Sequence, residues 1–163
     1  MTEIVTSLTV DSLRALLQHF GYRAEVITDD AAKVTLVRSA TSGLSFDIRP
    51  GNHLADHPAQ FVDCAFLASF KVEGELPLAP LNDWHNARRF CRLHLNQGFL
   101  MLDMDVSLAG GVTSDHLRAH LEIFDQLLQG LVAFLRSELP RLAANDASAT
   151  ALAPLSATVS PIG

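Results

Sequence analysis

The sequence predicts an α+β fold in which a mostly antiparallel sheet carries its helices on one side. Two kinds of segment lead to this class. In some, apolar residues recur every three or four positions, which is typical of helices, and in others every second residue is apolar, which is typical of half-buried strands. They follow one another in the order helix, four strands, helix, two strands, helix. The 163 residues fit a single domain, which we place at residues 1–139.

The first helix is predicted at residues 10–20, where the apolar side chains fall on one face. Thr9 stands at the position of an N-cap residue, whose side chain accepts a hydrogen bond from a free amide of the first turn. Gly21 stands where a left-handed residue ends many helices. Both ends of this helix are therefore marked in the sequence.

Four strands are predicted between the first two helices. Three short segments are rich in β-branched or alternating residues, namely residues 23–28, 33–38 and 44–49. A polar, histidine-containing loop follows. Residues 61–72 form a longer segment with apolar side chains at every second position, so we expect a central strand there.

A short helix is predicted at residues 82–89, with Asn82 or Asp83 as the residue that caps its first turn. A hairpin follows at residues 90–108. Its turn contains Gly98, which is suited to a positive φ.

The last helix is predicted at residues 114–139, with Thr113 as its N-cap. Beyond it, residues 140–163 are mostly Ala, Ser, Thr, Leu and Pro, and only Arg141 and Asp146 are charged. Such a composition favours a disordered tail outside the domain.

The composition excludes several classes of function. Twelve basic and 18 acidic residues give a net charge of −6, and no basic cluster is large enough to follow a nucleic-acid backbone. The chain is 48% hydrophobic and 18% charged, yet no run approaches the roughly 20 apolar residues of a membrane span. We therefore expect neither nucleic-acid binding nor a membrane span, and some apolar surface to be shared with a partner.

The two cysteines, Cys64 and Cys91, lie in apolar stretches and not at a paired-ligand spacing, which argues against a structural zinc site. The N-terminal residues carry Glu3 where a secretion signal has positive charge. We expect a cytoplasmic protein with reduced thiols.

Two pairs of side chains leave an alternative function open. His116 and His120 are four positions apart on the last helix, a spacing that a metal ion can bridge. The residue after His116 is Leu117 and not a glutamate base, and Glu122 lies on a different face of the helix. Loop residues His53, Asp56 and His57 could add ligands, but loop histidines are more often solvated, so the pair predicts metal binding only weakly.

Asp103 and Asp105 alternate along a strand, so both carboxylates point to one face, about 7 Å apart. That separation suits acid and base catalysis, but it is equally typical of the wet face of a half-buried strand. We expect these carboxylates to pair with Arg88, Arg89 or Arg92. We predict no catalytic residue, no cofactor and no metal.

The apolar face of the last helix is unusually broad. Leu117, Leu121, Phe124 and Leu128 lie near its centre, and flanking residues widen it to nearly half the circumference. A helix on one sheet needs only about 100°, so we expect a further surface against this helix. The candidate residues for a partner or dimer interface are Trp84, Arg88, Leu121, Phe124 and Leu128.

An ordered set of short segments resembles the bacterial YbjN family over residues 8–136. The segments are LNDWHNARRFCR at residues 81–92, NQG at 96–98, LDMD at 102–105, GGVT at 110–113, and Gly-Tyr at the end of the first helix. The family is described as sensory transduction regulators. The resemblance implies an α+β fold similar to class I type III secretion chaperones, which are small acidic homodimers that hold extended segments of client proteins.

The residues and the resemblance together predict a non-enzymatic, homodimeric regulator or chaperone-like adapter that binds an unidentified protein client. The alternative is a small metal- or ligand-binding protein, or an enzyme, that uses His116 and His120 or Asp103 and Asp105.

Overall fold

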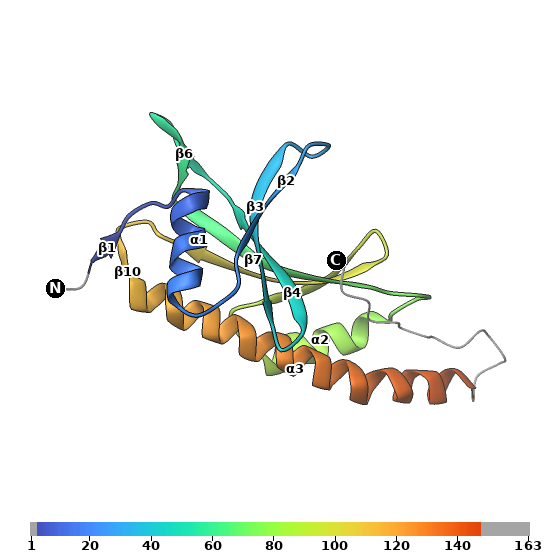
Figure 1. Ribbon diagram of the computed structural model, residues 1–163. Helices are drawn as coiled ribbons and strands as arrows, with labels where there is room; N and C mark the ends of the chain where they lie inside the picture. Colours follow the sequence, from blue (N-terminus) through green and yellow to red (C-terminus); the bar gives the residue numbers. More distant parts are fainter. Residues whose placement is uncertain (1–2, 148–163) are drawn as a thin grey trace.

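The computed structural model describes residues 3–147, and it has the predicted α+β architecture (Figure 1). The elements in chain order are β1 (Ile4–Val5), α1 (Val10–His19), β2 (Glu25–Asp29), β3 (Val34–Thr41), β4 (Leu44–Pro50), β5 (His53–Leu54), β6 (His57–Phe61), β7 (Asp63–Lys71), α2 (Leu78–Ala87), β8 (Arg92–Asn96), β9 (Phe99–Ser107), β10 (Val112–Thr113) and α3 (Ser114–Ala147).

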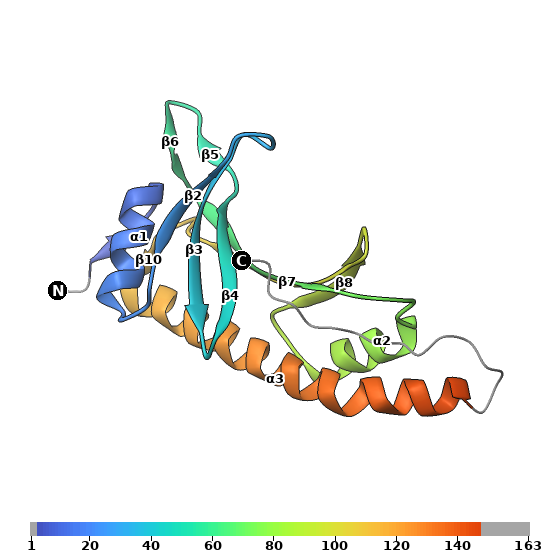
Figure 2. The same ribbon diagram turned by 45° about the vertical axis from the view of Figure 1, so that its right-hand side comes forward.

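The main sheet has six strands in the order β2-β3-β4-β7-β9-β8, and every neighbouring pair is antiparallel. β7 lies in the interior of the sheet, as its alternating pattern predicts. Figures 1 and 2 show α3 running along one side of the sheet, with α1 near its first turns and α2 beside its later turns. The three helices and the sheet share one hydrophobic core.

The predicted helix ends and turns are largely confirmed. The Thr9 side chain accepts a hydrogen bond from the Ser12 amide, and Gly21 has a φ of +87°. Thr113 caps α3 by accepting from the His116 amide at 3.1 Å. Gly98 has a φ of +82°, which suits a two-residue hairpin turn.

The start of α2 differs from the sequence prediction. The helix begins at Leu78, its N-cap is Pro77, and no side chain caps it, so Asn82 and Asp83 do not have the predicted capping role. The sequence prediction started the helix only after Pro77 and Pro80, because proline usually interrupts a helix. Pro80 lies in the first turn, where the amide that proline lacks has no partner within the helix in any case.

Two other boundaries also differ. The predicted polar loop after β4 contains the small β5–β6 hairpin. α3 continues through Pro140 to Ala147, past the predicted end at residue 139. A proline inside a helix costs about 3 kcal/mol, which the Ala-rich sequence that follows offsets in part. The rest of the predicted disordered tail, residues 148–163, lies outside the described residues.

Three phenylalanines form the centre of the core. The ring centroid of Phe124 on α3 lies 5.4 Å from that of Phe46 on β4 and 5.5 Å from that of Phe66 on β7. All three side chains are buried. These contacts fix α3 across the middle of the sheet.

Phe124→Ala is expected to lower the free energy of unfolding by about 3–5 kcal/mol, because it leaves a cavity beneath two aromatic rings. Urea denaturation followed by circular dichroism measures this loss. Gln126→Ala, on the exposed face of the same helix, is the matched control and should change stability by less than about 0.5 kcal/mol. A loss of similar size in both variants would contradict the central role of Phe124.

Candidate functional site

Four of the five predicted interface residues lie in the core. Trp84 is 1% exposed, and Leu121, Phe124 and Leu128 are at most 2% exposed. In this conformation they offer no surface to a partner, and of the five only Arg88 is exposed.

The broad apolar face of α3 has a simpler explanation within the chain. Leu117 and Leu121 lie against Leu13 and Leu17 of α1, and Phe124 packs on the sheet. Farther along, Phe134 meets the ring of Trp84 on α2 at 5.4 Å. The extra surface that the broad face requires is therefore supplied by α1 and α2.

The candidate functional site is the α2–β8 corner, which we define by Trp84, His85, Arg88, Phe90 and Cys91. The Arg88 guanidinium lies 5.0 Å from the centre of the Trp84 ring and covers it from the outside. Gly130 of α3 faces the same two side chains, since a Cβ there would lie 3.8 Å from each. This packing joins the end of α2 to the middle of α3.

His85 connects α2 to β8. Its Nε2 atom accepts a hydrogen bond from the main-chain amide of Leu93 at 2.9 Å. Because β8 is an edge strand, this amide points away from the sheet and would otherwise lack a partner. α2 therefore closes this part of the edge.

Phe90 is the unusual residue of the corner. It is 65% exposed and has a φ of +70°, a region that bulky residues rarely adopt. The Arg89 guanidinium lies 5.4 Å from its ring centre. An exposed aromatic side chain is held here in a strained backbone conformation, as is common where proteins bind other molecules.

A shallow depression of about 400 Å³ lies beside the corner, lined by Phe90, Cys91, Arg92, Asp103, Met104, Asp105 and His120. Arg92 contacts Asp103 and Asp105, each at 2.9 Å, which confirms the predicted pairing with one of the three arginines. The hydrogen bond with Asp103 raises the pKa of Arg92. The Arg92 guanidinium thus bridges the carboxylates of Asp103 and Asp105. Because one cation stabilises the charged form of both carboxylates, this pair is poorly arranged for acid and base catalysis.

His116 and His120 do lie side by side, with ring centroids 4.1 Å apart. However, Nδ1 of His120 lies 2.9 Å from the carbonyl oxygen of His116, so one ring nitrogen is engaged with the helix. Burial, and then His120, lower the pKa of His116. Within residues 3–147, no cluster of three or more His, Cys, Asp or Glu side chains is placed to hold a metal ion.

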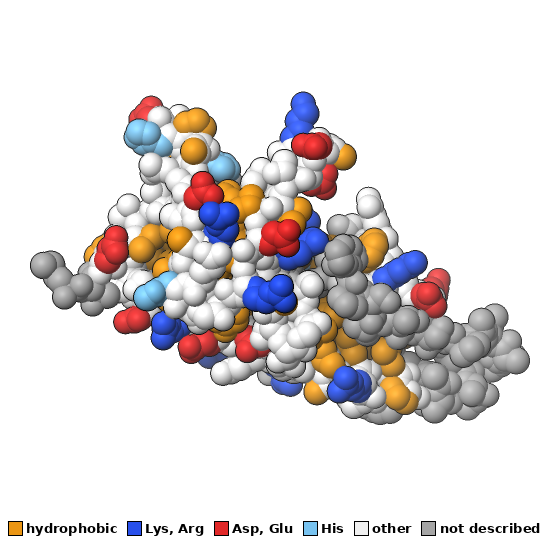
Figure 3. Space-filling view, in the orientation of Figure 1, with side chains coloured by type: hydrophobic (Ala, Val, Ile, Leu, Met, Phe, Trp, Pro, Cys, Tyr) orange, Lys and Arg blue, Asp and Glu red, His pale blue; other side chains and the backbone are white. Residues whose placement is uncertain are grey.

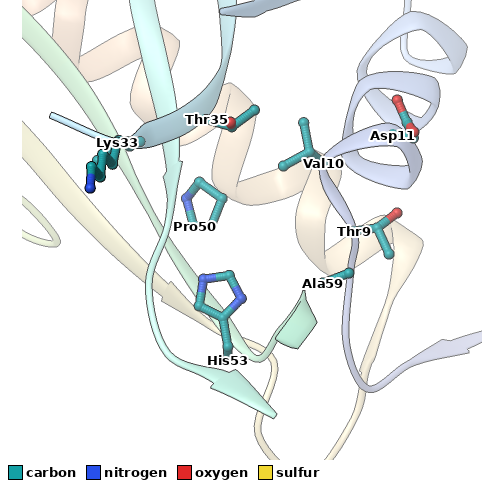
Figure 4. A pocket seen from close by; sticks show the side chains of 9 residues that line it. Thr9, Val10, Asp11, Lys33, Thr35, Pro50, His53 and Ala59 are labelled. Carbon is teal, nitrogen blue, oxygen red and sulfur yellow. The ribbon is translucent and has the colours of Figure 1, made fainter. Parts of the chain in front are cut away.

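A second depression, of about 490 Å³, lies between the start of α1 and the ends of β3 and β4 (Figure 4). In Figure 4 Val10 and Pro50 face its interior, whereas the charged ends of Asp11 and Lys33 point away. A small-molecule site usually combines an apolar lining with convergent polar groups. This depression lacks that convergence.

The two thiols differ in accessibility. Burial raises the pKa of Cys64 to about 12, and it also raises the pKa of the half-buried Cys91. At pH 8 a thiol reagent should therefore label Cys91 slowly and leave Cys64 unmodified in the folded protein. Mass spectrometry should find one label in the native state and two in urea. Cys91→Ser should abolish native labelling, and faster labelling of Cys64 than of Cys91 would contradict this environment.

No helix in the described part of the chain combines the length and the apolar character needed to cross a membrane. No curated protein matches the sequence. The structure is similar to "Crystal structure of YbjN, a putative transcription regulator from E. coli", with a TM-score of 0.54 and 16% sequence identity, over 80% of this chain and 96% of that chain. Residues 9–136 match the family model YbjN, described as "Putative bacterial sensory transduction regulator". The chain therefore belongs to the YbjN family.

Proposed function

We propose that this protein is a non-catalytic regulator that acts by binding another polypeptide, in the manner of a chaperone-like adapter, in the cytoplasm. We further propose that it acts as a homodimer. Membership of a family described as regulators supports the first part. The acidic net charge of −6 also suits a protein that keeps an apolar partner segment in solution.

The observation that carries the proposal is the apolar surface around α2. Leu78, at the start of α2, is 70% exposed, and Phe90, just after its end, is 65% exposed. Figure 3 shows hydrophobic side chains gathered over the later turns of α3 next to the described part of α2. Leu78 and Phe90 thus place large exposed apolar side chains at the two ends of α2, and exposed apolar surface is typical of protein-binding sites.

Arg88 remains a candidate interface residue, because it is the exposed one among the five that the sequence predicted. It lies between Leu78 and Phe90 in the sequence, and its guanidinium stacks on Trp84. Arginine and aromatic residues are enriched at the centres of protein interfaces. The proposed dimer surface is therefore the exposed side of α2, with Leu78 and Arg88 as its members.

Light scattering at micromolar concentration should find a dimer of about 35 kDa, twice the 17.7 kDa of one chain. Leu78→Asp should shift the protein to the monomer, because it places a charge in an apolar contact. Ala15→Asp, the same kind of change at an exposed position of α1, should leave the dimer intact. A wild-type protein that is monomeric throughout would refute the dimer.

The immobilised wild-type protein should also retain a defined polypeptide from a cytoplasmic extract in nearly equimolar amount. Elemental analysis and nucleic-acid staining of the same sample are the controls. Stoichiometric metal or nucleic acid, with no polypeptide, would contradict the proposed function.

A further inference from the structure

The main sheet ends in two edge strands, and within the described residues a helix forms a hydrogen bond with only one of them. Leu93 on β8 bonds to His85 of α2, so the β8 edge is closed at that point. β2 forms the opposite edge. Figures 1 and 2 show the β2–β3 hairpin projecting away from α2 and α3.

The turn between β3 and β4 determines which main-chain groups of β3 face β2. Ser42 and Gly43 both have positive φ, so they form a two-residue turn of the type that closes with a hydrogen-bonded pair, here Thr41 and Leu44. Hydrogen-bonded residues alternate along an antiparallel strand. Arg38 and Leu36 of β3 therefore direct their main-chain groups toward β2.

The same alternation then applies to β2. Glu25 pairs with Arg38 and Ile27 pairs with Leu36, so these residues of β2 point inward. Val26 and Thr28 direct their amides and carbonyls outward. Within the described residues, no hydrogen bond reaches these four groups from another element. The edge of β2 thus presents a row of open donors and acceptors, the pattern to which an extended peptide adds.

The charges of the edge favour a basic partner. β2 carries Glu25 and Asp29, and Asp30 follows in the turn. Arg38 of β3 lies opposite Glu25, whereas Asp29 lies opposite Val34, so the acidic character is strongest at the Asp29–Asp30 end of the edge. A partner strand lies directly opposite β2, so it meets the acidic side chains of the strand itself. Basic residues opposite these carboxylates stabilise the pairing.

A second copy of the chain fits this edge poorly. In the antiparallel register that pairs all five residues of β2, Glu25 of one copy lies opposite Asp29 of the other. Like charges directly opposite each other destabilise a sheet. The occupant we favour is therefore a different polypeptide.

A depression of about 520 Å³ extends the edge at its first residue. Its lining includes Arg23, Glu25, Ser39 and Ala40, where β3 continues past the start of β2. Arg38 also lines the depression, whereas the Ser39 side chain lies on the core face of the sheet, opposite Phe46, and its hydroxyl is buried without a hydrogen-bond partner in the described part of the chain.

We infer that the β2 edge binds an extended, basic segment of a partner polypeptide as a seventh strand of the sheet. This inference rests on the proposed function and names its binding mode and the chemistry of the partner.

The test uses a fluorescein-labelled heptapeptide, Lys-Val-Lys-Ile-Thr-Val-Lys, and fluorescence anisotropy with the full-length protein. Thr28→Pro removes one outward amide without removing a bond to β3, and it should weaken binding by about tenfold or more. Leu95→Pro is the matched control, because it makes the same change at an outward position of β8. It should leave the affinity unchanged. Circular dichroism checks that both variants fold.

The charge and the backbone are tested separately. A peptide with Glu in place of Lys should bind at least about tenfold more weakly, and Glu25→Gln combined with Asp30→Lys should reduce this preference. N-methylation of alternate peptide amides should abolish binding.

The inference is overturned if the basic peptide does not bind the wild-type protein at millimolar concentration, or if Thr28→Pro and Leu95→Pro behave alike. It is also overturned if Thr28→Pro converts a dimer to a monomer, because a second copy then occupies the edge. If the Thr28→Pro protein still retains the cytoplasmic polypeptide, the β2 edge is not the binding site, but the proposed function is still supported.

Discussion

The constraint on which the whole fold depends is that α3 must bury an apolar face nearly half its circumference wide. A single sheet cannot cover such a face, since a helix packed on one surface hides only about 100°. The chain solves this by adding a helix at each end of the contact. α1 covers Leu117 and Leu121, the sheet covers Phe124, and α2 brings Trp84 to Phe134. The positions of α1 and α2 are therefore consequences of the breadth of α3.

The placement of α2 makes the two edges of the sheet unequal. Because Trp84 must reach α3, the adjacent His85 lies at β8 and bonds to Leu93. This bond occupies one of the outward-facing amides of the β8 edge. α1 contacts β2, but within residues 3–147 no helix forms a hydrogen bond with its outward groups, which are accompanied by acidic side chains. Charged residues on an exposed edge are a common defence against unwanted pairing.

Local signals in the sequence predicted the fold well wherever a residue's role depends on its neighbours in the chain. Thr9 and Gly21 marked α1, Gly98 marked a turn, and alternation marked β7. The α+β class followed from these elements. The pairing of Arg92 with the two carboxylates could also be predicted, because the hairpin register places Arg92 opposite Asp103, and Asp105 follows two residues later on the same face of β9.

The candidate site was harder to predict because its residues are defined by packing between distant segments. A broad apolar helix face has the same sequence pattern whether α1 and α2 or a second subunit covers it, so Leu121 and Phe124 were assigned to an interface although they are core residues. Phe90 gave no local signal, since neither its positive φ nor its exposure follows from its neighbours. Which strands form the edges depends on the full topology. Edge pairing uses main-chain groups that every polypeptide shares, so any selectivity must come from side chains around the edge, such as Asp29 and Asp30. Surface residues that contribute nothing to the fold can therefore decide what the fold binds.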